Sequence, residues 1–269
     1  MKKKLIFAFS VFEGCLENRA IKLHMKSLRH YSWVFDEALF VFMGDPKYSV
    51  DVMRELLCMG FKDIQFRFRP ADGLWEAGVF YHEIIETNEN DGKLCFFAHT
   101  KGITNYRENF CPESIDVWIT SMYFFNLSDT EPIAKWLVSD TYAGTFFGSY
   151  LQHFEKDTII FKGWIYTGTF YWANVSRIRR ENKGIPAIFD RWWAERLPNY
   201  FSETCLASFG AIRFYEDYHM DLYHDYSLKA INTMFDMVRE ESGNDECYIK
   251  YRSFLNEAGI SLDIRRTRS

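Results

Sequence analysis

The chain has 269 residues, of which 48% are hydrophobic, and its formal net charge at pH 7 is −5. A chain of this length and apolar content can bury a full core, and we expect it to form one α/β domain. The acidic balance provides no basic field for a nucleic-acid backbone, so we expect no nucleic acid among the partners.

The cysteines and the first residues indicate a soluble, cytoplasmic protein. The six cysteines are scattered without a Cys-x-x-Cys pair, which argues against a zinc site or a disulfide framework and fits a reducing cytosol. The mostly apolar run Leu5–Phe12 follows lysines as in a signal peptide, but it is short and leads into Glu13 without a cleavage site. No run approaches the roughly 18 apolar residues that cross a bilayer. The basic ends Lys2–Lys4 and Arg265–Arg268 leave weak peripheral contact with an anionic inner membrane face as an alternative.

The N-terminal part of the chain alternates apolar strands with helical patterns. Short connections between such elements are typical of a mostly parallel, Rossmann-like sheet with helices on both faces. Neither G-x-G-x-x-G nor G-x-x-x-x-G-K-[ST] occurs there, so a dinucleotide motif and a P-loop are not supported. The predicted strands are Lys4–Val11, Ala38–Met43 and Asp63–Phe68, and the predicted helices are about Asn18–His30, Val50–Met59 and Leu74–Glu86.

The run Leu94–Ala98 is the centre of this pattern, and His99, Thr100, Lys101 and Gly102 follow it directly. Five small or apolar residues in a row predict a strand buried on both faces, as in the middle of a parallel sheet. Its carboxyl end is where open α/β sheets bind ligands, and a lysine there suits a phosphate. The alternative is a strand that ends in a solvated Lys101 with His99 packed at the rim, and the spacing alone does not decide between them.

Other strand ends supply further candidates for the nucleotide. Ser10 and Val11 end the first strand, and Arg67 and Arg69 lie at the end of the third. Arg107, in the polar loop after the lysine turn, is close enough in sequence to reach the same anion with its planar guanidinium. Exposed residues at strand ends are more often inert, which is the alternative for each.

The second half of the chain contains an aromatic segment, Thr167–Trp172, with the sequence Thr-Gly-Thr-Phe-Tyr-Trp. Aromatic rings beside hydroxyl groups suit a sugar site, because sugars have apolar faces and polar edges. In a chain so rich in aromatic residues, however, the core interpretation of any single ring comes first. The helices predicted around this segment are Pro112–Leu127, about Asn174–Arg180, Tyr226–Val238 and Tyr248–Ala258.

Glu195 follows two consecutive tryptophans, and Asp190 precedes them. A carboxylate among apolar rings suits the role of a general base that takes the proton from an attacking hydroxyl. The alternative is that Glu195 pairs with Arg191 or Arg196 on a solvated helix face.

The strand ending in His99-Thr100-Lys101-Gly102 resembles the HTKG segment of a bacterial family of small glycosyltransferases and related polysaccharide-biosynthesis proteins. Thr167–Trp172 is similar to the family's SGNFWW segment, with Thr for Ser, Thr for Asn and Tyr for the first Trp, and Trp118 falls where the family has a helical Trp. The resemblance covers most of Lys4 to Leu197, and only the HTKG strand is a close match. It implies one GT-A-like domain with a nucleotide-binding half (1–102), an acceptor and catalytic half (103–215) and C-terminal helices (216–269).

The resemblance implies a glycosyltransferase that moves a sugar from a nucleotide-diphosphate donor to a glycan or lipid-linked acceptor, with inversion as the expected course. The implied pathway is surface polysaccharide assembly, such as capsule or lipopolysaccharide. Together with the positional candidates, the predicted site has three parts. Glu195 and Asp190 are catalytic; Ser10, Val11, Arg67, His99, Thr100, Lys101, Gly102 and Arg107 bind the nucleotide sugar; and Thr167, Gly168, Thr169, Tyr171 and Trp172 bind the acceptor.

No D-x-D occurs in the chain, although GT-A enzymes ordinarily hold the diphosphate through Mn²⁺ or Mg²⁺ on carboxylates. We therefore expect Lys101 to offset the diphosphate charge directly, with Mn²⁺ or Mg²⁺ as an alternative cofactor. Asp217, His219 and Asp221 could supply metal ligands if their tract were a strand, but a loop is favoured. Two other functions stay open: a non-catalytic carbohydrate-binding or scaffold protein on the same fold, and a phosphotransferase that uses Lys101 and Arg107.

Overall fold

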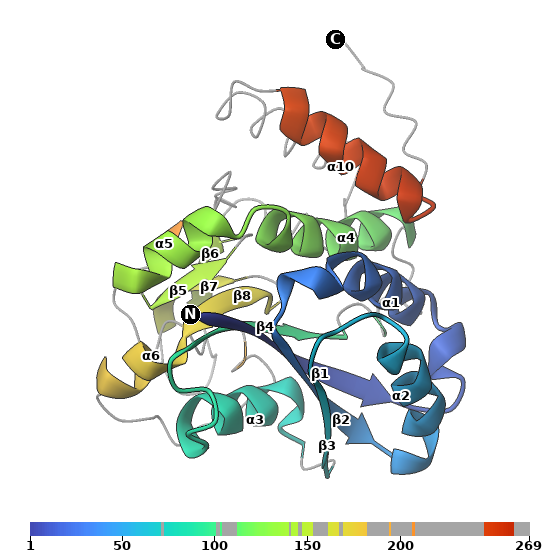
Figure 1. Cartoon of the computed structure of the whole chain (residues 1–269), viewed down its shortest axis with the longest axis horizontal. Coiled ribbons are helices and arrows are strands. Elements are labelled where there is room, and N and C mark those ends of the chain that lie inside the picture. Colours follow the sequence, from blue (N-terminus) through green and yellow to red (C-terminus); the bar gives the residue numbers. More distant parts are fainter. Residues whose placement is uncertain are drawn as a thin grey trace.

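A computed structural model of the chain describes residues 1–70, 73–100, 103, 112–139, 141–144, 147–152, 161–166, 169–181, 194, 206–207 and 245–260. These residues form an α/β fold around a mixed, mostly parallel sheet with the strand order β3-β2-β1-β4-β8-β5-β9 (Figure 1). The predicted fold class, a mostly parallel sheet with helices, is confirmed at this level.

The sheet is parallel from β3 to β4 and contains one strand, β8, that runs the opposite way to both of its neighbours. Its parallel part consists of β1 (Lys2–Val11), β2 (Glu37–Gly44), β3 (Ile64–Arg69) and β4 (Lys93–His99). β8 (Tyr171–Asn174) is antiparallel to β4 and to β5 (Tyr142–Gly144), and the short β9 (Leu206–Ala207) is parallel to β5. β6 (Phe147–Gln152) and β7 (Phe161–Tyr166) form a separate antiparallel pair.

The helices lie close to their predicted positions. Among the longer ones, α1 spans Arg19–Tyr31, α2 Ser49–Leu57, α3 Trp75–Tyr81, α4 Pro112–Leu127, α5 Glu131–Ser139, α6 Val175–Glu181 and α10 Asp245–Glu257. The short turns are η1 (Cys15–Glu17), η2 (Ser32–Val34), η3 (Pro46–Tyr48) and η4 (His82–Glu86), the last a π-helical turn that continues α3. The predicted helix Tyr226–Val238 lies outside the described residues. Within the described part of the chain, no helix combines the length and the apolar character needed to span a membrane.

Strand β1 separates two apolar cores because its side chains alternate between the faces of the sheet. Leu5, Phe7 and Phe9 pack with α1, α2 and α4, whereas Ile6 and Ala8 pack with α3 and α6. Figure 1 shows α1 and α4 on one side of the sheet and α3 and α6 on the other. The predicted covering of both faces by helices is therefore confirmed.

Helix α1 begins where the sequence provides a cap. The side chain of Asn18 accepts hydrogen bonds from the backbone N–H groups of Ala20 and Ile21, at 2.9 and 3.3 Å. These bonds satisfy donors that the first turn of a helix leaves without partners. The helix therefore starts directly after the turn that leaves β1.

The parallel strands end together at one edge of the sheet. Val11 at the end of β1 pairs with Gly44 at the end of β2, and Ala8 pairs with His99 at the end of β4. Because β8 runs the opposite way, its first residue, Tyr171, pairs with Phe97 near the end of β4. We refer to this side as the carboxyl edge of the sheet.

Replacing Gly44 with alanine should lower the free energy of unfolding by about 2–4 kcal/mol. Gly44 has a φ of +119°, and an added Cβ would fall well under 3.0 Å from the carbonyl oxygen of Val11. Equilibrium unfolding in urea measures the change.

Gly14→Ala is the matched control for this substitution. Gly14 also has a positive φ, +70°, but an added Cβ there meets open space, so only about 1 kcal/mol should be lost. Equal losses in the two variants would contradict a cost from the contact with Val11.

Candidate functional site

The strand order reverses between β1 and β4, which are neighbours in the sheet. The chain continues from β1 to β2 and β3 on one side, and β4 lies on the other side of β1. In open α/β sheets, the crevice outside the carboxyl ends of two such strands is the usual ligand site. The candidate site is therefore the carboxyl edge at the ends of β1 and β4.

His99 ends β4 on the face covered by α3. Its side chain is buried, and Nδ1 lies 3.6 Å from Oε1 of Glu76 in the first turn of α3. Its ring centroid lies 6.2 Å from that of Phe170, the residue before β8. The imidazole is thus held between the start of α3 and the segment that enters β8.

Thr100 extends the pairing of β1 and β4 by one residue. Its backbone N–H donates to the carbonyl of Ala8 at 3.2 Å, and its Oγ1 accepts from the backbone N–H of Ser10 at 3.1 Å. Ser10 is half-buried, whereas Val11 is buried in the core with α1. The structure therefore brings together the predicted residues Ser10, His99 and Thr100, and it places the side chain of Val11 in the core.

Arg69 ends β3 and lies against α3. A Cβ added to Gly78 of α3 would be 2.6 Å from Nη2 of Arg69, so the missing side chain at that position makes room for the guanidinium. The same helix therefore contacts both His99, through Glu76, and Arg69. The sequence indicated Arg69 by its position at a strand end. The feature that could have predicted its packing against α3 is Gly78, a glycine inside an apolar helical run.

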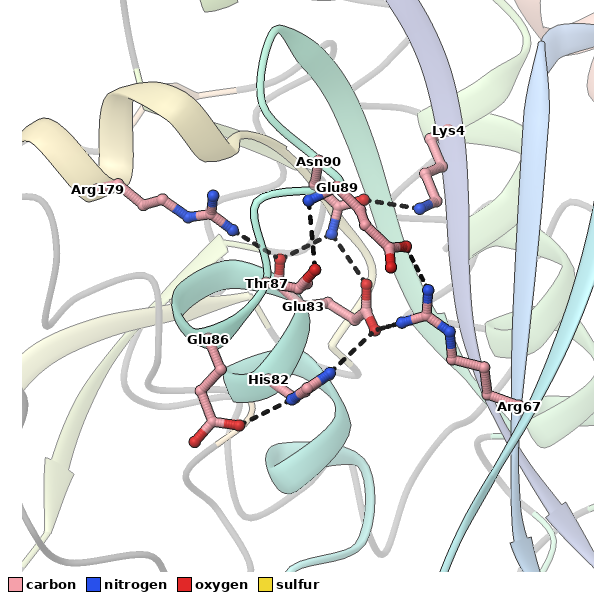
Figure 2. A network of polar contacts seen from close by, with 9 residues as sticks. All are labelled: Lys4, Arg67, His82, Glu83, Glu86, Thr87, Glu89, Asn90 and Arg179. Carbon is pink, nitrogen blue, oxygen red and sulfur yellow. Dashed lines mark hydrogen bonds and ion pairs between the residues drawn. The ribbon is translucent and has the colours of Figure 1, made fainter.

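Arg67, the other predicted cation of β3, belongs to a buried polar network (Figure 2). It forms ion pairs with Glu83, at 2.9 Å from Nη1 to Oε1, and with Glu89. Glu83 also accepts from Nδ2 of Asn90 at 2.9 Å, and Oδ1 of Asn90 accepts from Nζ of Lys4 at 2.7 Å. These partners favour a structural role for Arg67 over contact with a nucleotide.

The network compensates for charges inside the protein. Glu83 is 1% exposed and Lys4 is 2% exposed. Burial lowers the pKa of Lys4, because removal from water disfavours the charged ammonium group. Paired carboxylate, guanidinium and amide groups are what make such burial tolerable. The network therefore fixes η4 and the turn before β4 onto the sheet.

Replacing Glu83 with glutamine should lower the free energy of unfolding by about 2–4 kcal/mol, since it removes the carboxylate that compensates Arg67 inside the protein. Urea titration measures the change. Glu86→Gln is the control, because its carboxylate pairs with His82 at 2.7 Å but is 53% exposed, and it should cost less than about 1 kcal/mol. Similar losses in the two variants would mean that the buried ion pair contributes no more to the free energy of unfolding than an exposed one.

The rings predicted to bind the acceptor lie in the two cores. Trp172 is 1% exposed, and its Nε1 donates to the carbonyl of Asn126 at 2.9 Å. Its ring lies 5.2 Å from that of Phe96. Tyr171 is fully buried on the other face against Phe97, and burial raises the pKa of Tyr171 well above its ordinary value. These positions favour the core interpretation of both rings over the acceptor-binding one.

Thr169 is the member of the aromatic segment that reaches the carboxyl edge. β8 begins at Tyr171, which pairs with Phe97, two residues before His99 at the end of β4. Thr169 is buried and precedes Phe170, whose ring lies near that of His99. Among the predicted acceptor-binding residues that the structure describes, Thr169 is the one that lies before β8, next to Phe170.

Several predicted residues lie outside the described part of the chain, so their positions stay predictions. Within the described ranges, no group of three or more His, Cys, Asp or Glu side chains is arranged to hold a metal ion. The diphosphate contact expected of Lys101 and the catalytic role expected of Glu195 are among the predictions left open. The residues concerned are Lys101, Gly102, Arg107, Thr167, Gly168, Asp190, Glu195 and the tract 216–225.

No model of a known protein family matches the chain, and no curated protein matches it significantly. Any functional assignment therefore depends on the geometry of the carboxyl edge and on the motif at its centre.

Proposed function

We propose that the chain is a GT-A-like glycosyltransferase that moves a sugar from a nucleotide-diphosphate donor to a glycan or lipid-linked acceptor in surface polysaccharide assembly. The observation that carries the proposal is the position of the first two residues of the HTKG motif. His99 and Thr100 lie at the end of β4, beside β1, at the point where the strand order reverses. That is the position at which α/β sheets bind nucleotides.

The arrangement of the sheet also supports a GT-A-like fold. Four parallel strands in the order β3-β2-β1-β4 form the half that is proposed to bind the nucleotide. The reversed strand β8 begins at the same edge, and the ring of Phe170, the residue before it, lies near that of His99. The segments that we propose to bind the donor and the acceptor are far apart in the sequence, and their proximity at this edge supports the proposal.

The proposed chemistry assigns separate roles to the charged residues of the motif segments. Lys101, which follows Thr100 directly, offsets the charge of the diphosphate, and Arg107 and Arg69 are further cations for it. Glu195 takes the proton from the acceptor hydroxyl as its oxygen attacks the anomeric carbon. The bond from that carbon to the diphosphate breaks, and the nucleoside diphosphate leaves with the bonding electrons.

A non-catalytic carbohydrate-binding protein is the weaker alternative. The high content of aromatic residues and the missing D-x-D allow it, but the burial of Tyr171 and Trp172 removes two of the rings from contact with a glycan.

Calorimetric titration with a panel of nucleotide sugars, followed by product detection, tests the proposal. Lys101→Ala should weaken nucleotide-sugar binding by at least about tenfold, roughly 1.4 kcal/mol, because the diphosphate loses its cation. Lys135→Ala is the control, since that lysine is exposed on α5 and pairs with Glu131. Failure of the wild type to bind any nucleotide sugar would overturn the proposal, and glycan binding without nucleotide affinity would favour the alternative.

Glu195→Gln should lower the rate of transfer by at least about 10²-fold while nucleotide affinity stays nearly unchanged, because a general base acts on the acceptor and not on the donor. Unchanged turnover would remove Glu195 from that role. Loss of turnover in EDTA, with recovery in Mn²⁺, would contradict the metal-independent binding of the diphosphate.

A further inference from the structure

Two non-glycine residues in the described part of the chain have a left-handed backbone, Trp75 with φ +50° and Thr169 with φ +61°. Bulky and β-branched residues rarely adopt this conformation, because their Cβ crowds the backbone carbonyl. Such strain persists only where the surrounding structure enforces it, and it gathers at ligand-binding sites. Each of them directly precedes a residue that contacts His99: Glu76 follows Trp75, and Phe170 follows Thr169.

Trp75 directly precedes Glu76, the residue of α3 that contacts His99. It is the first residue of α3, and the carboxylate of the next residue, Glu76, lies 3.6 Å from Nδ1 of His99. The Trp75 side chain is 55% exposed, although the apolar repeat of Leu74–Glu86 predicts a buried position. A strained backbone therefore holds a large aromatic ring in solvent at the rim of the candidate site.

Thr169 lies in the segment that enters β8, one residue before Phe170. It is fully buried, and within the described part of the chain its Oγ1 has no hydrogen-bond partner. The residue after it, Phe170, has its ring centroid 6.2 Å from that of His99. Burial of an unsatisfied hydroxyl on a strained backbone is costly, and in native proteins such groups call for an explanation beyond packing. Each of these two segments that contact His99 thus contains a residue with a strained backbone, Trp75 before Glu76 and Thr169 before Phe170.

We infer that Trp75 is the stacking surface for the base of a nucleotide whose phosphates lie toward the ends of β1 and β4. Nucleobases stack on exposed aromatic rings with little dependence on which base is present, because every base has a π-face. The ring stands at the start of α3, between the ends of β3 and β4 in the chain, on the side of the sheet proposed to bind the nucleotide. This inference rests on the proposed function and adds the residue that contacts the base.

Titration with UDP, GDP, ADP and CDP tests the inference in the full chain. Trp75→Phe should keep the affinity of the preferred nucleotide within about threefold of the wild type, because a ring remains. Trp75→Asn should weaken it by about tenfold or more, while the melting temperature stays level or rises, since asparagine tolerates a left-handed backbone. A merely structural tryptophan would instead lose stability and affinity together.

Trp33→Asn is the matched control. Trp33 is 65% exposed in η2, and the backbone of Asp36, just after η2, is hydrogen-bonded to Lys3 at the opposite edge of the sheet. Its removal should leave nucleotide affinity unchanged. Unchanged nucleotide affinity in Trp75→Asn, or weaker binding of free glucose or galactose without any effect on nucleotides, would overturn the inference alone. Absence of nucleotide binding by the wild type would overturn the proposed function and the inference with it.

Discussion

Strand β1 is hydrogen-bonded along both edges, in parallel with β2 on one side and β4 on the other. Residues from Leu5 to Phe9 are fully buried, because helices cover both faces of the sheet around them. A strand in this position leaves only its two ends accessible. Since the order of strands reverses beside it, the carboxyl end of β1 and that of β4 form one shared edge, and every residue of the candidate site depends on that pairing.

The same pairing explains why charged residues lie inside the protein. Lys4 belongs to a strand that is buried on both sides, so its ammonium group cannot reach water and is hydrogen-bonded to Asn90 instead. Asn90 in turn donates to the carboxylate of Glu83, which pairs with Arg67. Each group provides a hydrogen bond or an opposite charge for the group before it in place of water, and buried charges are tolerated only under this condition.

The order of the elements was predictable because it depends on local patterns. An uninterrupted apolar run such as Leu94–Ala98 is stable only where both faces are covered, so the sequence alone indicated the central strand. Trp75 fitted the helical repeat equally well, but that repeat assumes helical φ values throughout, and a left-handed residue breaks the assumption. Arg67 and Arg69 share one face of β3, and no local sequence pattern distinguishes the structural arginine from the one at the candidate site. Their positions differ in the residues they contact, which come from later segments of the chain: Glu83 and Glu89 for Arg67, and Gly78 of α3 for Arg69.

Helix α3 and its continuation η4 connect the buried network to the carboxyl edge. The first turn of α3 places Glu76 against His99, and Gly78 makes room for Arg69 in the same helix. In η4, Glu83 binds Asn90 through both its carboxylate and its backbone carbonyl, at 2.9 and 2.7 Å. Asn90 lies in the turn that leads directly into β4, so the same side chain helps to fix the start of the strand that ends in His99. A displacement of α3 would therefore move Glu76 and Gly78 together, and with them the contacts to His99 and to the guanidinium of Arg69. The buried carboxylate of Glu83, in the turn that continues the helix, opposes that displacement through its bonds to Arg67 and Asn90.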